Sequence, residues 1–88
     1  MKTKFVVCFE MLDTSDNKTI LNGCSVYELD TEDDNALVDL QETLRKSSII
    51  EYCRALNAVN TGATLTTEHV EAFYKDRLVV KINSIARW

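Results

Sequence analysis

An alternation of side chains near the start of the chain constrains the fold more than any other feature of this sequence. Over eight residues, every second side chain is apolar, which is the period of a β-strand. One face consists of Phe5, Val7, Phe9 and Met11, and it alternates with Lys4, Val6, Cys8 and Glu10. Because the second face also carries apolar side chains, we expect this strand to lie inside a sheet with a neighbour on either side.

A turn and a second strand are predicted next. The segment Asp13–Asn17 is rich in Asp, Asn, Ser and Thr, which hydrogen-bond to nearby backbone groups and tolerate left-handed backbone. The following residues, about 18–29, have the composition of a strand, so the two strands form an antiparallel hairpin. The pair Asn22-Gly23 predicts a β-bulge within the second strand.

The middle of the chain carries two helical patterns. Thr31 stands three residues before Asp34, a weak form of the capping box that marks a helix start. Two apolar stripes follow that are displaced by about a third of a turn, and Ser48–Glu51 fits a second capping box. We therefore expect two helices with a break or sharp kink near Ser47, the second ending at Asn60-Thr61-Gly62. The stripes are Leu37, Leu40 and Leu44, and then Ile49, Tyr52, Cys53, Leu56 and Val59.

The last part of the chain predicts a short helix and a strand. Thr66 is a suitable N-cap, with Leu65 packing on Val70, so we prefer a helix to a strand for residues 66–76. A final strand follows from the alternation of Leu78, Val80 and Ile82 with Val79, Lys81 and Asn83. The predicted fold is α+β: one domain over residues 1–88, with an N-terminal β-hairpin, two to three helices packed on one face of a small sheet, and a C-terminal return strand.

Charge is distributed unevenly along this chain, whose net charge is −4. Seven carboxylates and no Lys or Arg lie between residues 28 and 42, whereas most bases lie in the C-terminal half. A one-signed surface field governs association with partners, so we expect this acidic run to meet a basic protein. The run, together with the aromatic C-terminal residue, forms the predicted partner-binding set: Glu28, Asp30, Glu32, Asp33, Asp34, Asp39, Glu42 and Trp88.

Metal and cofactor motifs are absent from the sequence. Asp30, Glu32 and Asp34 alternate like the first ligands of a calcium loop, but the loop glycine is missing. His69 and the three cysteines lack the Cys-x-x-Cys spacing of a zinc site, and we expect Cys8 and Cys53 to be free thiols packed among apolar side chains. We predict no metal and no cofactor.

The compartment is predicted to be the cytoplasm. The apolar run near the N-terminus is only five residues long before Glu10, which is too short for a signal peptide or a membrane span. A reducing compartment also fits the odd number of cysteines.

Two alternative functions stay open beside protein binding. The first is an RNA-associated module that uses the basic C-terminal residues Lys75, Arg77, Lys81 and Arg87. The second is a minimal enzyme centred on His69, with Glu71 or Tyr74 as the partner in acid–base chemistry. A homodimer is compatible with all three hypotheses.

In overall character the chain resembles the small early proteins of tailed phages, including host-takeover and anti-defence inhibitors. It is short, free of proline and rich in Lys, Asn, Asp and Thr, and it lacks a catalytic motif. The resemblance implies a non-enzymatic inhibitor or antitoxin-like neutraliser in the cytoplasm of a host cell. Such a protein would cover the basic face of a host nuclease, a toxin or a nucleic-acid-processing enzyme.

Overall fold

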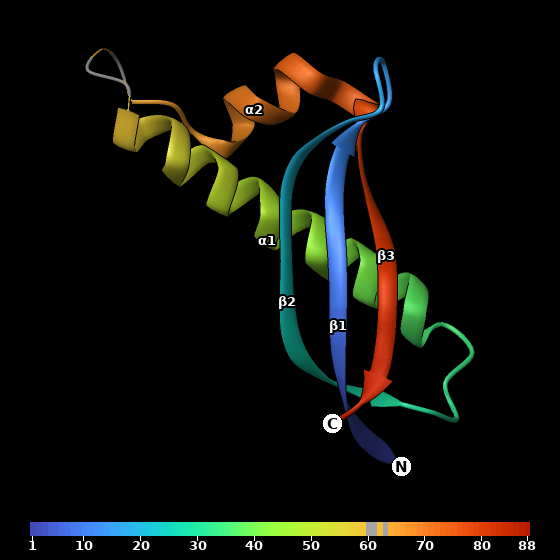
Figure 1. Ribbon diagram of the computed structural model, residues 1–88. Coiled ribbons are helices and arrows are strands. Elements are labelled where there is room, and N and C mark those ends of the chain that lie inside the picture. Colours follow the sequence, from blue (N-terminus) through green and yellow to red (C-terminus); the bar gives the residue numbers. More distant parts are fainter. Residues whose placement is uncertain (60–61, 63) are drawn as a thin grey trace.

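Three long antiparallel strands form the frame of the molecule (Figure 1). The computed structural model describes residues 1–59, 62 and 64–88. Strands β1 (Lys2–Asp13), β2 (Lys18–Asp30) and β3 (Leu78–Arg87) lie in the order β2-β1-β3. Helices α1 (Ala36–Val59) and α2 (Thr67–Tyr74) and the 3₁₀ turn η1 (Lys75–Arg77) complete the described elements. The α+β class, the N-terminal hairpin, the central position of the first strand and the return strand are confirmed.

The hairpin turn forms as its composition predicts. Asp13 Oδ1 accepts a hydrogen bond from the Ser15 N–H at 2.9 Å, and Asp16 Oδ1 accepts one from the Lys18 N–H at 3.0 Å. Asn17 has a left-handed backbone with φ of 57°, a conformation that asparagine tolerates better than most residues.

The bulge of the hairpin lies elsewhere than predicted. The register shifts where Met11 faces Leu21 and Leu12 faces Thr19, which leaves Ile20 as the extra residue. Gly23 instead pairs regularly with Phe9, so the predicted bulge at Asn22-Gly23 is wrong. The Phe9 ring lies beside Gly23, with its Cζ 3.5 Å from the point where a Cβ on residue 23 would stand, which is an ordinary contact distance.

Helix α1 is one continuous helix of 24 residues, so the predicted break near Ser47 is wrong. The helix crosses the sheet diagonally (Figure 1) and meets different neighbours along its length. Its first half packs Leu40 and Leu44 against Val7 and Phe9. Its second half packs Ile49 and Cys53 in another cluster, which also contains Met11, Val70 and Leu78. The displacement between the two apolar stripes follows this change of neighbours.

The ends of α1 also differ from expectation. The helix begins at Ala36 rather than near Thr31, and the Asp39 N–H donates to Asn35 O at 2.9 Å. Val59, placed in the second stripe by its spacing, is 81% exposed. The predicted end at Asn60-Thr61-Gly62 falls largely outside the described residues.

Helix α2 confirms the preference for a helix in the last part of the chain. The Thr66 hydroxyl accepts from the His69 N–H at 3.3 Å, and the His69 ring nitrogen Nδ1 accepts from the Thr66 N–H at 3.2 Å. This reciprocal arrangement is a capping box with histidine in place of the usual Glu or Gln. Leu65 packs in the same cluster as Val70.

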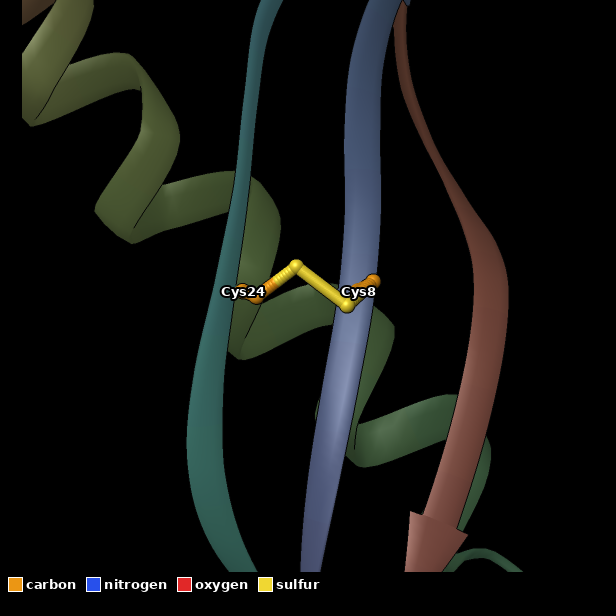
Figure 2. Close-up of a disulfide and its surroundings, with 2 residues drawn as sticks. All are labelled: Cys8 and Cys24. Atoms are coloured by element: carbon orange, nitrogen blue, oxygen red, sulfur yellow. A yellow bond between two sulfur atoms is a disulfide. The ribbon is translucent and has the colours of Figure 1, made fainter.

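Both helices lie on one face of the sheet, and the other face carries a disulfide (Figures 1 and 2). Cys8 and Cys24 are direct cross-strand partners with Cα atoms 4.1 Å apart, and their sulfur atoms are bonded. The prediction of a free Cys8 is therefore wrong, because only the register of the hairpin places it opposite Cys24. The bond also removes the support that the cysteines gave to a reducing compartment, since disulfides are rare there. Cys53 is free and buried, as expected. Neither helix of the described chain combines the length and apolarity needed to cross a bilayer.

Candidate protein-binding surface

The connection from β2 to α1 gathers carboxylates at one end of the molecule. Two Asx turns shape it: Asp30 Oδ1 accepts from the Glu32 N–H at 3.0 Å, and Asp33 Oδ1 accepts from the Asn35 N–H at 2.9 Å. The Glu32 N–H and the α-ammonium group of Met1 lower the pKa of Asp30. The short side chains of Asp therefore serve the local backbone while the loop itself stays exposed.

The sheet register pairs two of the seven carboxylates with lysines of β1. Asp30 lies directly opposite Lys2, and Glu28 lies directly opposite Lys4. Opposite charges at such cross-strand positions partly neutralise each other. The net negative charge of the run is consequently smaller than the sequence indicates. The Met1 ammonium reduces it further, because it lies 3.7 Å from the Glu32 carboxylate. Of the seven, five make no ion pair within the described part of the chain: Glu28, Asp33, Asp34, Asp39 and Glu42. Among these five, only Glu28 faces a lysine across the sheet.

A hollow of about 290 Å³ separates the end of β2 from the first turns of α1. Four of the predicted carboxylates line it: Glu28, Asp30, Asp33 and Asp39. Tyr27 and Leu40 contribute apolar surface to the same hollow. Glu42 lies apart from this group, because it lines a separate hollow between α1 and β3 that also contains Val38 and Val79.

Two apolar side chains stand exposed on the first turn of α1, where Leu37 follows the carboxylates of the loop in sequence and Val38 borders the hollow that Glu42 lines. Leu37 is 52% exposed and Val38 is 63% exposed, although the sequence placed Leu37 in the buried stripe of α1. Of that stripe, only Leu40 and Leu44 are buried in the core. Carboxylates that only face water and offset the helix dipole would not need exposed apolar side chains beside them. We call Asp33, Asp34, Leu37, Val38 and Asp39 the acidic corner.

Trp88 lies at the same end of the sheet as the acidic corner. Its backbone N–H donates to Lys4 O at 3.0 Å, and Lys4 lies opposite Glu28. Trp88 and Glu28 thus flank the same residue of β1 from its two sides, one strand spacing of about 4.8 Å away on each side. The indole is 75% exposed. In Figure 1 the C-terminus and the connection from β2 to α1 both lie at the lower end of the sheet.

The four basic residues of the alternative RNA site do not converge. Lys75 and Arg77 precede β3, whereas Arg87 is its last residue, a separation of about 30 Å along an extended strand. Lys81 lies opposite Glu10, on the sheet face away from the helices. Arg77 already contacts protein groups: its Nε is 3.6 Å from Asp13 Oδ1, and its guanidinium lies over the rings of Phe73 and Tyr74.

His69 and the cysteines are likewise placed apart. The His69 ring takes part in the capping box, and on α2 the positions of Glu71 and Tyr74 are rotated from it by about 200° and 140°. Glu71 Oε1 pairs with Arg45 Nη1 at 2.9 Å. Cys53 lies under Leu65, whose carbonyl oxygen is 3.2 Å from its sulfur. Among the described residues, no group of three or more His, Cys, Asp or Glu side chains could hold a metal ion.

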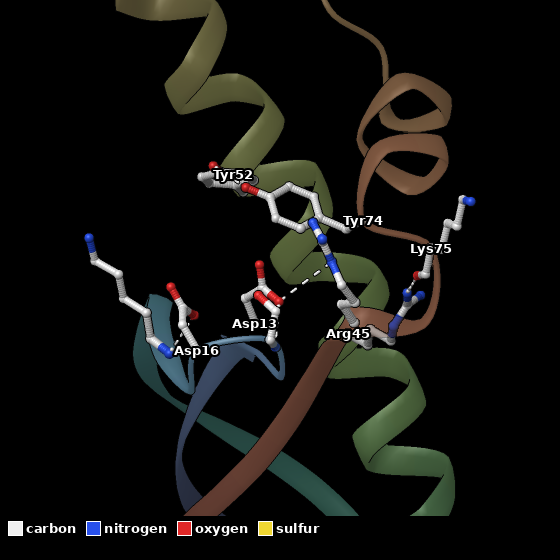
Figure 3. A network of polar contacts seen from close by, with 9 residues as sticks. Asp13, Asp16, Arg45, Tyr52, Tyr74 and Lys75 are labelled. Carbon is white, nitrogen blue, oxygen red and sulfur yellow. Dashed lines mark hydrogen bonds and ion pairs between the residues drawn. The ribbon is translucent and has the colours of Figure 1, made fainter.

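A polar cluster between the hairpin turn and the helices was not predicted from the sequence (Figure 3). The hydroxyl groups of Tyr52 and Tyr74 lie 3.0 Å apart, and both tyrosines border a hollow of about 300 Å³ with Asp13 and Asp16. The hydrogen bond with Tyr52 and the burial of the ring raise the pKa of Tyr74 to about 12. No spacing in the sequence relates Tyr52 to Tyr74, because they lie on different helices.

Asp13 joins this cluster to β3. Its carboxylate is buried, with the Ser15 N–H and the Arg77 guanidinium beside it, and these two groups lower its pKa. The Thr14 N–H donates to Arg77 O at 2.9 Å, which fastens the hairpin turn to the start of β3. These contacts hold the three strands together at this end, so we assign the cluster a structural role.

Comparison of the chain with protein-family models, with curated proteins and with solved structures gave no match.

Proposed function

We propose that this protein is a non-enzymatic binding module that docks its acidic corner on a basic protein surface. The observation that supports the proposal is the exposure of Leu37 and Val38 on the same helix turn as Asp39 and just after Asp33 and Asp34, three carboxylates without an ion pair in the described part of the chain. Protein interfaces combine an apolar centre with a polar rim. A solvated helix start would need the carboxylates alone, as partners of the helix dipole.

The two kinds of side chain would contribute different things to binding. The carboxylates would steer the encounter and raise the association rate, with a strong dependence on salt. Leu37, Val38 and the exposed indole of Trp88 would supply most of the affinity, since aromatic and apolar side chains dominate binding hot spots. The bound module would then cover the basic face sterically.

The partner class that fits this surface is a protein that itself binds nucleic acid, such as a nuclease, a toxin or a nucleic-acid-processing enzyme. Such proteins expose Lys and Arg for phosphate contacts, and an acidic module competes for the same groups. The resemblance to small phage proteins supports the same class, with an inhibitor or antitoxin-like neutraliser that acts on a host protein.

The test is capture from a nuclease-treated bacterial lysate with the native chain and two matched variants. Asp33→Lys/Asp34→Lys changes the acidic corner, and Glu51→Lys/Glu68→Lys changes two exposed acids elsewhere by the same charge. We expect a basic protein that survives nuclease treatment and is retained by the control but lost with the corner variant. Against the purified partner, the corner variant should also associate more slowly and with a weaker salt dependence.

Two results would overturn this proposal. Equal capture by both variants would mean that the acidic corner does not bind the partner. A captured set that disappears on nuclease treatment would instead favour RNA binding, and replacing Lys75, Arg77 and Lys81 by Glu would then test that alternative.

A further inference from the structure

The outer edge of β2 is a long strand edge without a partner in the described structure. The 4.1 Å between the Cα atoms of Cys8 and Cys24 is the short spacing of a non-hydrogen-bonded pair. In such a pair the backbone N–H and C=O of Cys24 point away from β1. Strand alternation gives Asn22 and Val26 the same outward direction, and no protein group within the described ranges bonds to these three outward positions.

The middle of this edge lacks the features with which natural edge strands avoid pairing. Short length, proline, charged side chains, bulges and covering groups all protect an edge, and the bulge of β2 at Ile20 lies outside the outward positions 22–26. Strand β2 has 13 residues, and residues 20–27 contain neither a proline nor a charged side chain.

The opposite edge of the sheet, formed by β3, is protected in comparison. The Arg45 Nε donates to Leu78 O at 2.9 Å, so this carbonyl group at the start of β3 is already satisfied. A register shift where Cys8 faces Ser84 and Phe9 faces Ile82 leaves Asn83 as an extra residue and interrupts the strand. Such bulges hinder pairing with another chain.

The charges along β2 indicate what would pair with it. Lys18 stands at one end of the strand, and Glu28 and Asp30 stand at the other. A second β2 running antiparallel places Lys18 of each copy next to the acidic end of the other, whereas a parallel copy would bring like charges together. Antiparallel pairing of one strand with itself also closes as a two-fold dimer, while pairing of β2 with β3 of another copy would continue into an open assembly.

We propose that two copies of this chain associate through their β2 edges, antiparallel and centred on Cys24, to form one six-stranded sheet. In this register Val26 of one copy lies opposite Asn22 of the other, and both exchange backbone hydrogen bonds. A two-fold axis perpendicular to the sheet keeps the helices of both copies on the same face. The inference uses none of the acidic-corner residues and stands independently of the proposed function.

The experiment is sedimentation equilibrium over a concentration series, with one proline variant for each sheet edge. Val26→Pro removes an outward N–H that β1 does not use, which an edge strand tolerates. Ile85→Pro is the matched control on β3, because alternation from the Trp88 N–H bonded to Lys4 O directs the Ile85 N–H outward as well. We expect a dimer for the native chain and the control. For Val26→Pro we expect a dissociation constant about tenfold higher or more, since two hydrogen bonds are lost per dimer.

Amide hydrogen exchange of the native chain provides a second measurement that needs no variant. The N–H groups of Asn22, Cys24 and Val26 should become protected as the protein concentration rises, while that of Ile85 should not. A single-chain mass at millimolar concentration would overturn the proposal. A dimer that persists equally in Val26→Pro, or concentration-dependent protection confined to other strands, would overturn it too.

Discussion

Arg45 makes three contacts that join α1 to α2 and to the start of β3. Replacing it by methionine measures how much these contacts contribute to the free energy of unfolding. Its Nε donates to Leu78 O at 2.9 Å, one terminal nitrogen donates to Lys75 O at 3.4 Å, and the other pairs with Glu71 Oε1 at 2.9 Å. The side chain is only 27% exposed, so water replaces these partners poorly. Methionine keeps most of the apolar stem and removes the charge and all donors.

The expected loss follows from the kind of each contact. A hydrogen bond from a charged donor to a poorly solvated acceptor contributes about 1.5–3 kcal/mol, and the Leu78 contact is of this kind. The longer Lys75 contact and the half-exposed Glu71 pair add little, about 0.5 kcal/mol each or less. We therefore expect Arg45→Met to lower the free energy of unfolding by about 2–3 kcal/mol. For a domain of this size that is a fall in melting temperature of about 10–20 °C.

Urea unfolding followed by circular dichroism measures this change, with Glu71→Gln as the control. The control keeps Arg45 on both carbonyl groups and should cost about 0.5 kcal/mol. The slope of the transition should be the same for all three proteins, since the exposed area on unfolding does not change. If Arg45→Met were no less stable than Glu71→Gln, the two backbone contacts would contribute nothing and the reasoning would be refuted.

Three further predictions concern the disulfide, the tyrosine pair and the α2 cap. Reduction of the Cys8–Cys24 bond, which joins residues 16 positions apart, should cost about 3 kcal/mol; thermal melts with and without a thiol reductant measure this, and unchanged melts would contradict it. The pKa of Tyr74 is raised from 10.0 to about 12, so the stability that this group contributes is complete below pH 10 and is lost as the pH rises through 12. Absorbance titration should show this late ionisation, and in Tyr52→Phe it should move back towards 10; an unmoved value would show that the pair is not its cause. Thr66→Ala should cost about 1 kcal/mol in urea unfolding, whereas Thr66→Ser should retain the cap, and equal losses would argue against a capping role.

Local patterns in the sequence predicted the elements that local chemistry decides. The alternation around Phe9 gave a central strand, the Asp13–Asn17 cluster gave the hairpin turn, and Thr66 gave the start of α2. Each depends on residues a few positions apart, whose hydrogen bonds and side-chain directions are fixed by the backbone of their own segment. Capping by the His69 ring is a variant of the expected box that the Glu/Gln pattern does not describe.

The wrong predictions concern features that depend on packing between segments far apart in the sequence. Two displaced apolar stripes suggested a break near Ser47, but a diagonal crossing lets one straight helix use both against different parts of the core. The sequence cannot show this, because the displacement is the same whether the helix bends or its neighbours change. The bulge at Ile20, the exposure of Leu37 and the bonding of Cys8 depend likewise on register and on where the sheet ends.

The acidic run between residues 28 and 42 was visible in the sequence, but the net charge of the surface that it forms was not. The sequence by itself determined that seven carboxylates lie close together, because they are close along the chain. Only the tertiary structure decided that Lys2 and Lys4 offset two of them and that Leu37 stands exposed on the first turn of α1, since strand pairing and helix packing join residues that are far apart in sequence. For the same reason the contacts of Tyr52 with Tyr74 and of Arg45 with Leu78 belong to the fold alone: each partner lies on an element whose position is set by burial of the common core.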